Sequence, residues 1–175
     1  MSLRSTRVLG MRGFTLIELL VTLALVGLLA SVSVPLYEVT VTRSKEAELR
    51  DALRTIRAGL DAYKAAVDTG LLPRAAGESG FPPTLETLAQ PQDTVNKRDL
   101  GTAPAGDKAA PERIVFLRRV PRDPFYPDQL TPAEQTWNTR AYATLSDDPQ
   151  PGADVFDVSS KSDRTALDGT KYSNW

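Results

Sequence analysis

The sequence RGFTLIELLVTLALVGLLASVSVPLYE, from Arg12 to Glu38, decides the fold of this chain. Within it, Phe14 to Val34 is a stretch of 21 residues whose only charged side chain is Glu18. At about 1.5 Å per residue, a helix of this length is roughly 30 Å long, which is enough to cross the core of a bilayer. The stretch therefore predicts a membrane-spanning helix with one carboxylate near its N-terminal end.

A short basic leader precedes this stretch. Its charged side chains are all positive: Arg4, Arg7 and Arg12. They predict a cytoplasmic N-terminus, with everything after Val34 on the opposite side of the membrane. A secretory signal peptide is one alternative, but the apolar run exceeds the usual h-region of about 7–15 residues, and residues 35–38 (PLYE) are not a small-residue cleavage site. A plain membrane anchor is another, and it leaves Gly13 and Glu18 unexplained.

The motif RGFTLIE, Arg12 to Glu18, resembles the class III signal of type IV pilins and of the pseudopilins of type II secretion systems. In that family a prepilin peptidase cleaves after the glycine and methylates the new N-terminus. The resemblance implies cleavage between Gly13 and Phe14, N-methylation of Phe14, and a mature chain of 162 residues. It also implies that Glu18 pairs with the N-terminal amine of a neighbouring subunit, and that Pro35 is the proline found shortly past the apolar core.

The expected pair is physically reasonable. An α-amine is mostly protonated at neutral pH, so pairing it with Glu18 inside a filament would offset the desolvation cost of both charges. Before assembly, Glu18 lies only about 6 Å below the new terminus, so its carboxylate can approach the lipid headgroups. The pair is therefore expected to set the register between subunits.

Composition limits the function classes. Without the leader the chain carries 18 basic and 22 acidic side chains, a net charge of −4, and it has no basic stripe, so we expect no nucleic-acid partner. It has no cysteine and no histidine, which excludes Cys/His zinc sites and Ser-His-Asp or Cys-His catalysis. We therefore expect a protein that is not an enzyme. The missing cysteines also argue against those type IV pilins whose C-terminal loop is closed by a disulfide.

The polar sequence after the span predicts a continuing helix. Pro35 should bend it rather than end it. Its apolar residues recur at helical spacings: Leu49, Leu53, Ile56, Leu60, Tyr63 and Val67. One helix is therefore predicted from about Phe14 to Asp68, ended by Gly70 and Pro73, with this stripe packed on the protein's own sheet.

The rest of the chain predicts short elements and long loops. Residues 83–90 predict a short helix capped by Thr84, with Leu85 and Leu88 facing inward. Residues 91–112 predict an extended loop, either functional or a disordered spacer. Residues 137–145 and 155–159 predict two strands separated by turns, while the prolines of 121–124 exclude a regular element there. Trp137, Tyr172 and Trp175 are expected to pack over the sheet.

These elements make an α+β fold, which the resemblance describes as pilin-like. The segments LRRVPRDPF, WNTRAYA and the ending VFDVSSKSDRTALDGTKYSNW also resemble the C-terminal domains of pseudopilins. The predicted organisation has five parts: a cytoplasmic leader at 1–13, a transmembrane and filament-core helix at 14–34, its amphipathic continuation at 35–68, a variable loop region with a short helix at 69–113, and a small sheet domain with a C-terminal loop at 114–175.

The C-terminal segment offers a candidate metal site. Four aspartates fall within it, interleaved with serine, threonine and glycine: Asp154, Asp157, Asp163 and Asp168. Oxygen ligands on a flexible loop suit Ca²⁺, although the spacing is not that of an EF-hand. The resemblance implies calcium too, because major pseudopilins bind it in their C-terminal loop. The alternative is a solvated loop in which the aspartates cap turns.

The resulting hypothesis is a structural subunit of a type II secretion pseudopilus, of the major type. The resemblance implies a homo-oligomeric filament with other pseudopilins, and prepilin peptidase, an assembly ATPase and an inner-membrane assembly platform as partners. It implies an inner-membrane protein with a periplasmic domain, which later enters a periplasmic filament for protein secretion. Two alternatives stay open: a major or minor pilin of a type IV pilus used for adhesion, motility or DNA uptake, and a single-span periplasmic binding protein.

Overall fold

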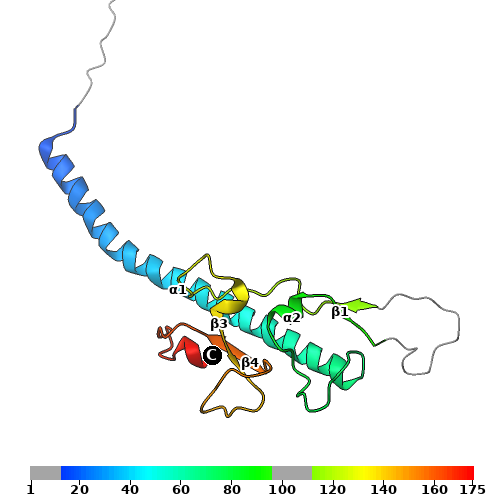
Figure 1. Ribbon diagram of the computed structural model, residues 1–175. Helices are drawn as coiled ribbons and strands as arrows, with labels where there is room; N and C mark the ends of the chain where they lie inside the picture. The colour runs from blue at the N-terminus through cyan, green and yellow to red at the C-terminus, as the bar shows by residue number, and fades with distance from the viewer. Residues whose placement is uncertain (1–12, 96–111) are drawn as a thin grey trace, which may run out of the picture. The chain divides into compact units, whose positions relative to one another are not determined.

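The computed structural model describes residues 13–95 and 112–175, and Figure 1 shows its elements along the chain. Of the predicted leader only Gly13 is described, and most of the predicted loop at 91–112 lies outside the described residues. The elements are α1 (Leu16–Asp68), α2 (Glu86–Ala89), β1 (Gln92–Asp93), β2 (Arg113–Ile114), β3 (Trp137–Arg140) and β4 (Asp157–Ser160), with short 3-10 turns at Ala133–Thr136 and Tyr172–Asn174. This is the predicted α+β fold. The chain divides into two compact units, one that ends at Thr42 and one that begins at Arg43.

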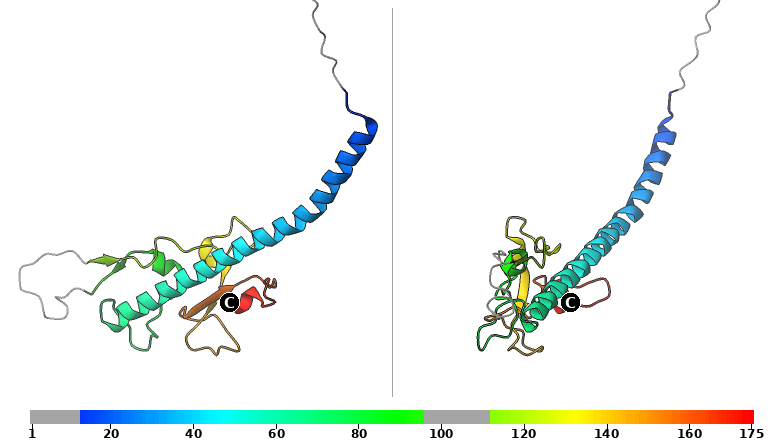
Figure 2. Two further views of the ribbon diagram at one scale, coloured as in Figure 1. Left: turned by 180° about the vertical axis from the view of Figure 1, so that it is seen from behind. Right: turned by 90° about the vertical axis from the view of Figure 1, so that its right-hand side faces the viewer.

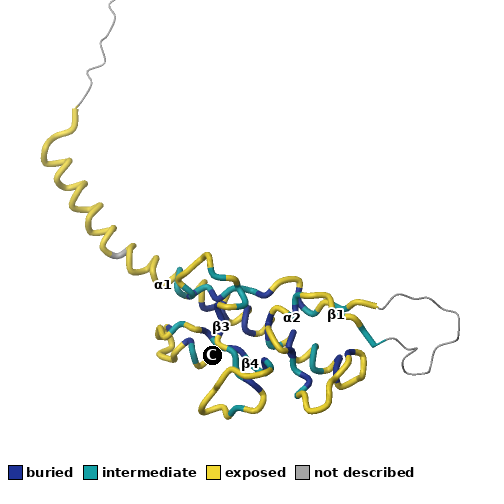
Figure 3. Tube along the Cα trace, viewed as in Figure 1, coloured by how far each residue is buried: buried dark blue, intermediate teal, exposed yellow. Residues whose placement is uncertain are grey.

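In the first unit, α1 exposes its apolar side chains. The helix runs through Pro35 without ending, as the sequence predicts. Its apolar part is long and hydrophobic enough to cross a membrane, and no residue of that window is buried within the chain. In Figure 3 the tube along this part of α1 is drawn in yellow, the colour of exposed residues. An apolar surface of this size must be covered by lipid or by another protein rather than exposed to water.

In the second unit, one face of α1 forms the floor of the core. Leu49, Ile56 and Leu60 are almost fully buried, and Leu53 is 3% exposed. The predicted stripe is thus confirmed, with Tyr63 half-buried at its edge. The side chains that cover it come from the rest of the unit: Leu85, Leu88, Leu117, Val120, Phe125, Trp137, Val155, Val158, Ala166 and Tyr172.

α1 ends just before Gly70, as the sequence predicts. Gly70 has a φ of +73°, a left-handed conformation that glycine adopts without strain. The Leu71 N–H donates to the Ala66 carbonyl (2.9 Å) and the Gly70 N–H to the Val67 carbonyl (3.0 Å). These two bonds form a Schellman motif, which satisfies carbonyls that the helix leaves open. The helix therefore ends where its stripe ends.

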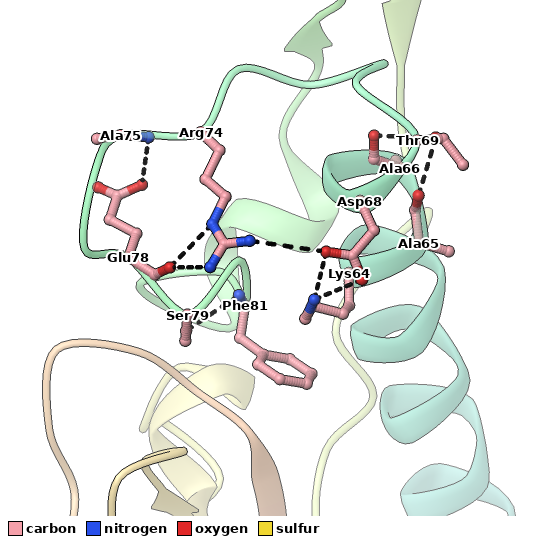
Figure 4. Close-up of polar contacts among 10 residues, drawn as sticks. All are labelled: Lys64, Ala65, Ala66, Asp68, Thr69, Arg74, Ala75, Glu78, Ser79 and Phe81. Atoms are coloured by element: carbon pink, nitrogen blue, oxygen red, sulfur yellow. Dashed lines mark hydrogen bonds and ion pairs between the residues drawn. The ribbon is translucent and has the colours of Figure 1, made fainter.

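A turn after the helix is tied back to it by polar contacts (Figure 4). Asp68 lies between Lys64, which it contacts closely, and Arg74, at 3.9 Å. The Arg74 guanidinium in turn donates to the Glu78 carbonyl at 2.9 Å. Surface ion pairs of this type contribute only about 0.2–1 kcal/mol each. They orient the turn that leads to Phe81, while apolar burial holds the unit together.

The short helix α2 lies within the predicted segment, but its N-terminal cap differs from the prediction. Leu85 (3% exposed) and Leu88 (0%) face inward as expected. The prediction that Thr84 caps α2 is wrong: Leu85 occupies the cap position without a side-chain bond, and the Thr84 hydroxyl instead contacts the Thr87 hydroxyl at 3.0 Å. Beyond α2, the two-residue strands β1 and β2 pair antiparallel, with β1 in a segment predicted as loop.

Strands β3 and β4 form an antiparallel ladder in which Trp137 pairs with Ser160 and Arg140 with Asp157. In the left view of Figure 2 the orange strand β4 lies beside the part of α1 that belongs to this unit, and Arg57 of α1 donates to the Val158 carbonyl of β4 at 3.0 Å. The strands are shorter than predicted, for two reasons. The Ala141 N–H donates to the Gln150 carbonyl (2.9 Å), which turns the chain, and the Val155 N–H donates to Pro82 (2.8 Å) rather than to the ladder.

The proline-rich segment before β3 has no regular element, as predicted. A buried carboxylate organises it. Asp123, 1% exposed, accepts the Phe125 N–H at 2.8 Å and the Ser160 hydroxyl at 2.5 Å. The Trp137 indole N–H donates to the Pro121 carbonyl at 2.9 Å. Trp137 and Tyr172 are buried in the core and Trp175 packs against it, as the sequence predicts.

Candidate functional site

The first candidate site is the N-terminal end of α1. Gly13 and Phe14 precede the helix, and the Phe14 side chain is 76% exposed. The Thr15 hydroxyl accepts the Glu18 N–H at 3.2 Å, and the Thr15 carbonyl accepts the Leu19 N–H at the same distance. Thr15 thus caps α1, with Glu18 at the third helical position, the spacing of a capping box. Sequence reasoning missed this role, although the T-x-x-E pattern was its signal.

Glu18 is exposed in the first turn of α1. A carboxylate there is favoured by the partial positive charge of the helix N-terminus. Within the described residues its carboxylate has no hydrogen-bond or ion-pair partner. The exposed Gly13–Phe14 bond lies next to it, directly before the first helical turn.

The hydroxyl groups of the apolar stretch are satisfied by the helix itself. After the capping residue Thr15, each donates to a carbonyl three or four positions earlier: Thr22 to Leu19 (3.0 Å), Ser31 to Gly27 (2.9 Å) and Ser33 to Leu29 (2.9 Å). Such bonds allow serine and threonine to lie in an apolar environment at little cost. Among the described side chains of the stretch, Glu18 is therefore the polar group that still requires a partner.

Pro35 lies inside α1, just past this stretch. Because proline has no N–H, the carbonyl of Ser31 loses its usual helical donor. The helix nevertheless continues on both sides of Pro35. Pro35 thus marks the point at which the exposed apolar sequence gives way to the amphipathic continuation.

The second candidate region is the C-terminal segment, which a buried carboxylate of α1 holds. Glu46, 6% exposed, accepts the Tyr172 hydroxyl at 3.0 Å and the Leu167 N–H at 2.8 Å. The Tyr172 ring stacks on Phe125 with centroids 4.1 Å apart. Burial, and then the hydrogen bond to Glu46 and its charge, raise the pKa of Tyr172 to about 12.

Arginines one and three turns further along α1 hold the same segment. Arg57 donates to the Asp157 carboxylate (2.8 Å) and to the main-chain oxygens of Val158 (3.0 Å) and Trp175 (2.9 Å). The Arg50 guanidinium lies 4.2 Å from the centre of the Trp175 ring. Neither arginine belongs to the apolar stripe, and their spacing in the sequence gives no signal of these contacts.

Three of the four aspartates of the predicted calcium site have separate partners. Asp157 faces Arg57 and also Arg140, at 3.6 Å. Asp154 accepts the Tyr142 N–H at 2.8 Å. Asp168 accepts the Thr170 hydroxyl at 2.6 Å and the Thr170 N–H at 2.9 Å, and these bonds, with the nearby Arg50, lower the pKa of Asp168.

Asp163 lies exposed on the loop between Asp157 and Asp168. In the part of the chain that the structure describes, no three acidic side chains lie close enough together to hold a metal ion. The structure therefore does not bring Asp154, Asp157, Asp163 and Asp168 together as one ligand set. Calcium binding by these residues stays a prediction.

Comparison with protein families finds a prokaryotic N-terminal methylation motif at residues 10–34. The match includes the Gly13–Phe14 bond, the capping residue Thr15 and Glu18. Comparison with curated proteins and with solved structures gives no match. The motif, together with the exposed apolar helix, supports a type IV pilin-like protein with a prepilin processing signal and a membrane-anchoring helix.

Proposed function

We propose that this protein is a structural subunit, of the major type, of a type II secretion pseudopilus. The observation that carries the proposal is the methylation motif at residues 10–34, in whose apolar stretch Glu18 is the charged side chain. Its carboxylate has no partner within the described residues. A second subunit's N-terminal amine, created by cleavage after Gly13, supplies that partner. The protein is accordingly not an enzyme but a substrate of one, the prepilin peptidase.

The subunit has two successive states in this proposal. It first spans the inner membrane through residues 14–34, with the leader in the cytoplasm and the second unit in the periplasm. After cleavage and N-methylation of Phe14, an assembly ATPase and the membrane platform transfer it into a filament of copies of itself and other pseudopilins. The filament acts in the export of folded proteins.

The exposed face of α1 supports this transfer. The large apolar side chains described between Phe14 and Val39 are exposed, so they exchange contacts with lipid for contacts with neighbouring helices. Lipid tails are as apolar as leucine, so close packing must supply the attraction. Small residues that allow close approach are spread along the stretch: Ala24, Gly27, Ala30 and Ser31.

Intact-mass measurement of the protein purified from membranes tests the processing step. We expect the loss of residues 1–13 and a gain of about 14 Da for one methyl group on the Phe14 amine. Gly13→Leu should block the loss, because the prepilin peptidase of the family that the motif resembles cleaves after a glycine. A protein that keeps its leader in cells with an active prepilin peptidase contradicts the proposal.

Deletion of the gene separates secretion from a type IV pilus. We expect exported proteins to accumulate in the periplasm while motility, adhesion and DNA uptake are unchanged. Restoring the intact gene should restore export. The opposite result, normal export with loss of surface pili, indicates the alternative of a type IV pilin.

Calcium binding is tested on the processed protein in detergent. A ligand at 100 times its Kd stabilises the folded state by about 2.7 kcal/mol, so calcium is expected to raise the melting temperature and EDTA to lower it. Asp163→Asn and Asp168→Asn should remove the response. Asp147→Asn, an acidic residue outside the four, is the control. A melting temperature that neither calcium nor EDTA moves contradicts the calcium prediction.

A further inference from the structure

A pocket in the second unit lies against the β3–β4 ladder. Its volume is about 890 Å³, within the range of roughly 300–1,000 Å³ that is typical of small-ligand sites. Four lining residues are paired across the ladder, Asn138 with Ser159 and Arg140 with Asp157. Because neighbouring strand residues alternate between the two faces, these four lie on the face opposite the buried side chain of Val158.

The loop between β3 and β4 and the C-terminal residues complete the lining, and both are held by contacts of their own. The Ala141 N–H donates to the Gln150 carbonyl at 2.9 Å, which closes the base of the loop. A Cβ at Gly152 would lie 2.7 Å from the Ala141 side chain, so the two ends of the loop pack closely. The Trp175 indole N–H donates to the Thr170 hydroxyl at 2.7 Å. The pocket is therefore formed without a ligand.

The basic groups of the lining already have partners in the same chain. Arg57 donates to one oxygen of Asp157 at 2.8 Å, and Arg140 lies 3.6 Å from the other. The Lys161 ammonium donates to the Gln135 carbonyl at 2.7 Å. An anionic ligand would have to compete with Asp157 for the two arginines. The pocket is therefore poorly suited to a phosphate or carboxylate ligand.

The groups of the lining that remain available are mostly neutral. Within the described residues, the Asp147 carboxylate forms no hydrogen bond, and the same holds for four neutral side chains: Ser146, Ser159, Ser173 and Asn174. The hydroxyls and the amide both donate and accept, and the carboxylate only accepts. An apolar ligand would desolvate these groups without replacing their bonds. A ligand rich in hydroxyl groups satisfies them, while Trp175, Pro149 and Pro151 offer apolar surface to its C–H groups.

We propose that this pocket binds a neutral oligosaccharide. A sugar ring combines hydroxyl groups at its edge with C–H groups on its faces, which is the combination that the lining accommodates. Asp147 accepts from the sugar hydroxyls, Ser159 and Asn174 bond others, and the Trp175 ring contacts a C–H face. The proposal concerns the second unit alone and does not depend on filament assembly.

Ligand-observed NMR titration of the full chain tests this site. The protein is kept in a zwitterionic detergent, because a detergent with a sugar headgroup would compete. The probes are cellobiose and N,N′-diacetylchitobiose, with inorganic phosphate and glucuronate as charged comparators. We expect saturable binding of at least one disaccharide and weaker binding of both anions. Whichever disaccharide binds more tightly shows whether the pocket prefers an N-acetylated glycan or an unmodified one.

Two neighbouring aspartates provide a matched pair of variants. Asp147→Asn is expected to weaken disaccharide binding about tenfold, because a charged acceptor is lost. Asp148→Asn should bind as the wild type does, since Asp148 is not part of the lining and its bond to the Gln150 amide can be kept by an asparagine oxygen. Absence of disaccharide binding, tighter binding of phosphate or glucuronate, or equal affinity of Asp147→Asn and the wild type overturns the proposal. None of these results bears on cleavage or filament assembly.

Discussion

Replacing Glu18 with alanine is expected to abolish filament assembly and reduce N-methylation while leaving cleavage after Gly13 intact. The variant leaves the amine of Phe14 buried among apolar helices without its counter-charge. An uncompensated buried charge costs about 3–5 kcal/mol, which corresponds to a loss of more than about 100-fold in assembly. The measurement is the amount of filament sheared from cells, together with the intact mass of the membrane form.

Two variants make this result specific. Glu18→Asp keeps the charge but shortens its reach, so partial assembly is expected. Glu38→Ala removes an exposed carboxylate of the same helix outside the apolar stretch and should assemble normally. The membrane-inserted amount of Glu18→Ala should equal that of the wild type, because α1 loses no contact within the described chain. Normal filaments and normal methylation of Glu18→Ala would show that the pair does not exist.

The sequence predicted the parts of the fold that local periodicity determines. The helix and its buried stripe followed from spacings of three and four residues, and Gly70 marked its end. These features are local, because burial of one helical face repeats within a few turns. The methylation motif is local in the same sense, since Gly13, Phe14 and Glu18 are close neighbours in the chain.

Features that depend on distant partners were not predictable in this way. Glu46 lies on the helix beside the stripe, yet its partners Leu167 and Tyr172 are 121 and 126 positions away. The end of β3 depends on an N–H of Ala141 that bonds Gln150 instead of a strand neighbour. The spacing of residues in the sequence does not predict these partners, because tertiary contacts decide them.

The same contrast explains the aspartates of the C-terminal segment. Their density suggested one oxygen-rich site, but the partners of Asp154, Asp157 and Asp168 come from the turn after β3, from α1 and from a local turn. A cluster in sequence becomes a cluster in space only if the backbone turns its side chains toward one point. The Asp157 carboxylate faces the Arg57 guanidinium of α1 instead of the other aspartates.

Raising the pH above about 10 is expected to destabilise the second unit through Tyr172. Its pKa is about 12 in the folded protein against an ordinary value of 10.0, so the fold favours the neutral phenol. The stabilisation is complete below about pH 10 and is lost as the pH rises toward 12. Over that window the free energy of unfolding should fall by up to about 1.4 kcal/mol per pH unit from this group.

Tyr172→Phe provides the direct test by urea unfolding in detergent, followed by tryptophan fluorescence from neutral to alkaline pH. At neutral pH the variant should be about 1.5–3 kcal/mol less stable, because Glu46 loses a hydrogen bond to a buried carboxylate. With no phenol to ionise, it should lack this alkaline loss, so the two stability curves converge as the pH approaches 12. Tyr142→Phe, at an exposed ring, controls for the loss of a hydroxyl.

Glu46→Gln separates burial from charge as the origin of this effect. The amide keeps an oxygen that can accept from the Tyr172 hydroxyl and the Leu167 N–H, but it removes the negative charge that disfavours a tyrosinate. Burial is the larger cause of the raised pKa, so the alkaline loss should persist in Glu46→Gln, still beginning near pH 10 but ending at a lower pH and with a smaller total. Parallel curves for the wild type and Tyr172→Phe up to pH 12 would mean that Glu46 does not fix the C-terminal segment through this phenol. The segment would then be held mainly by Arg57 and the Tyr172–Phe125 stack.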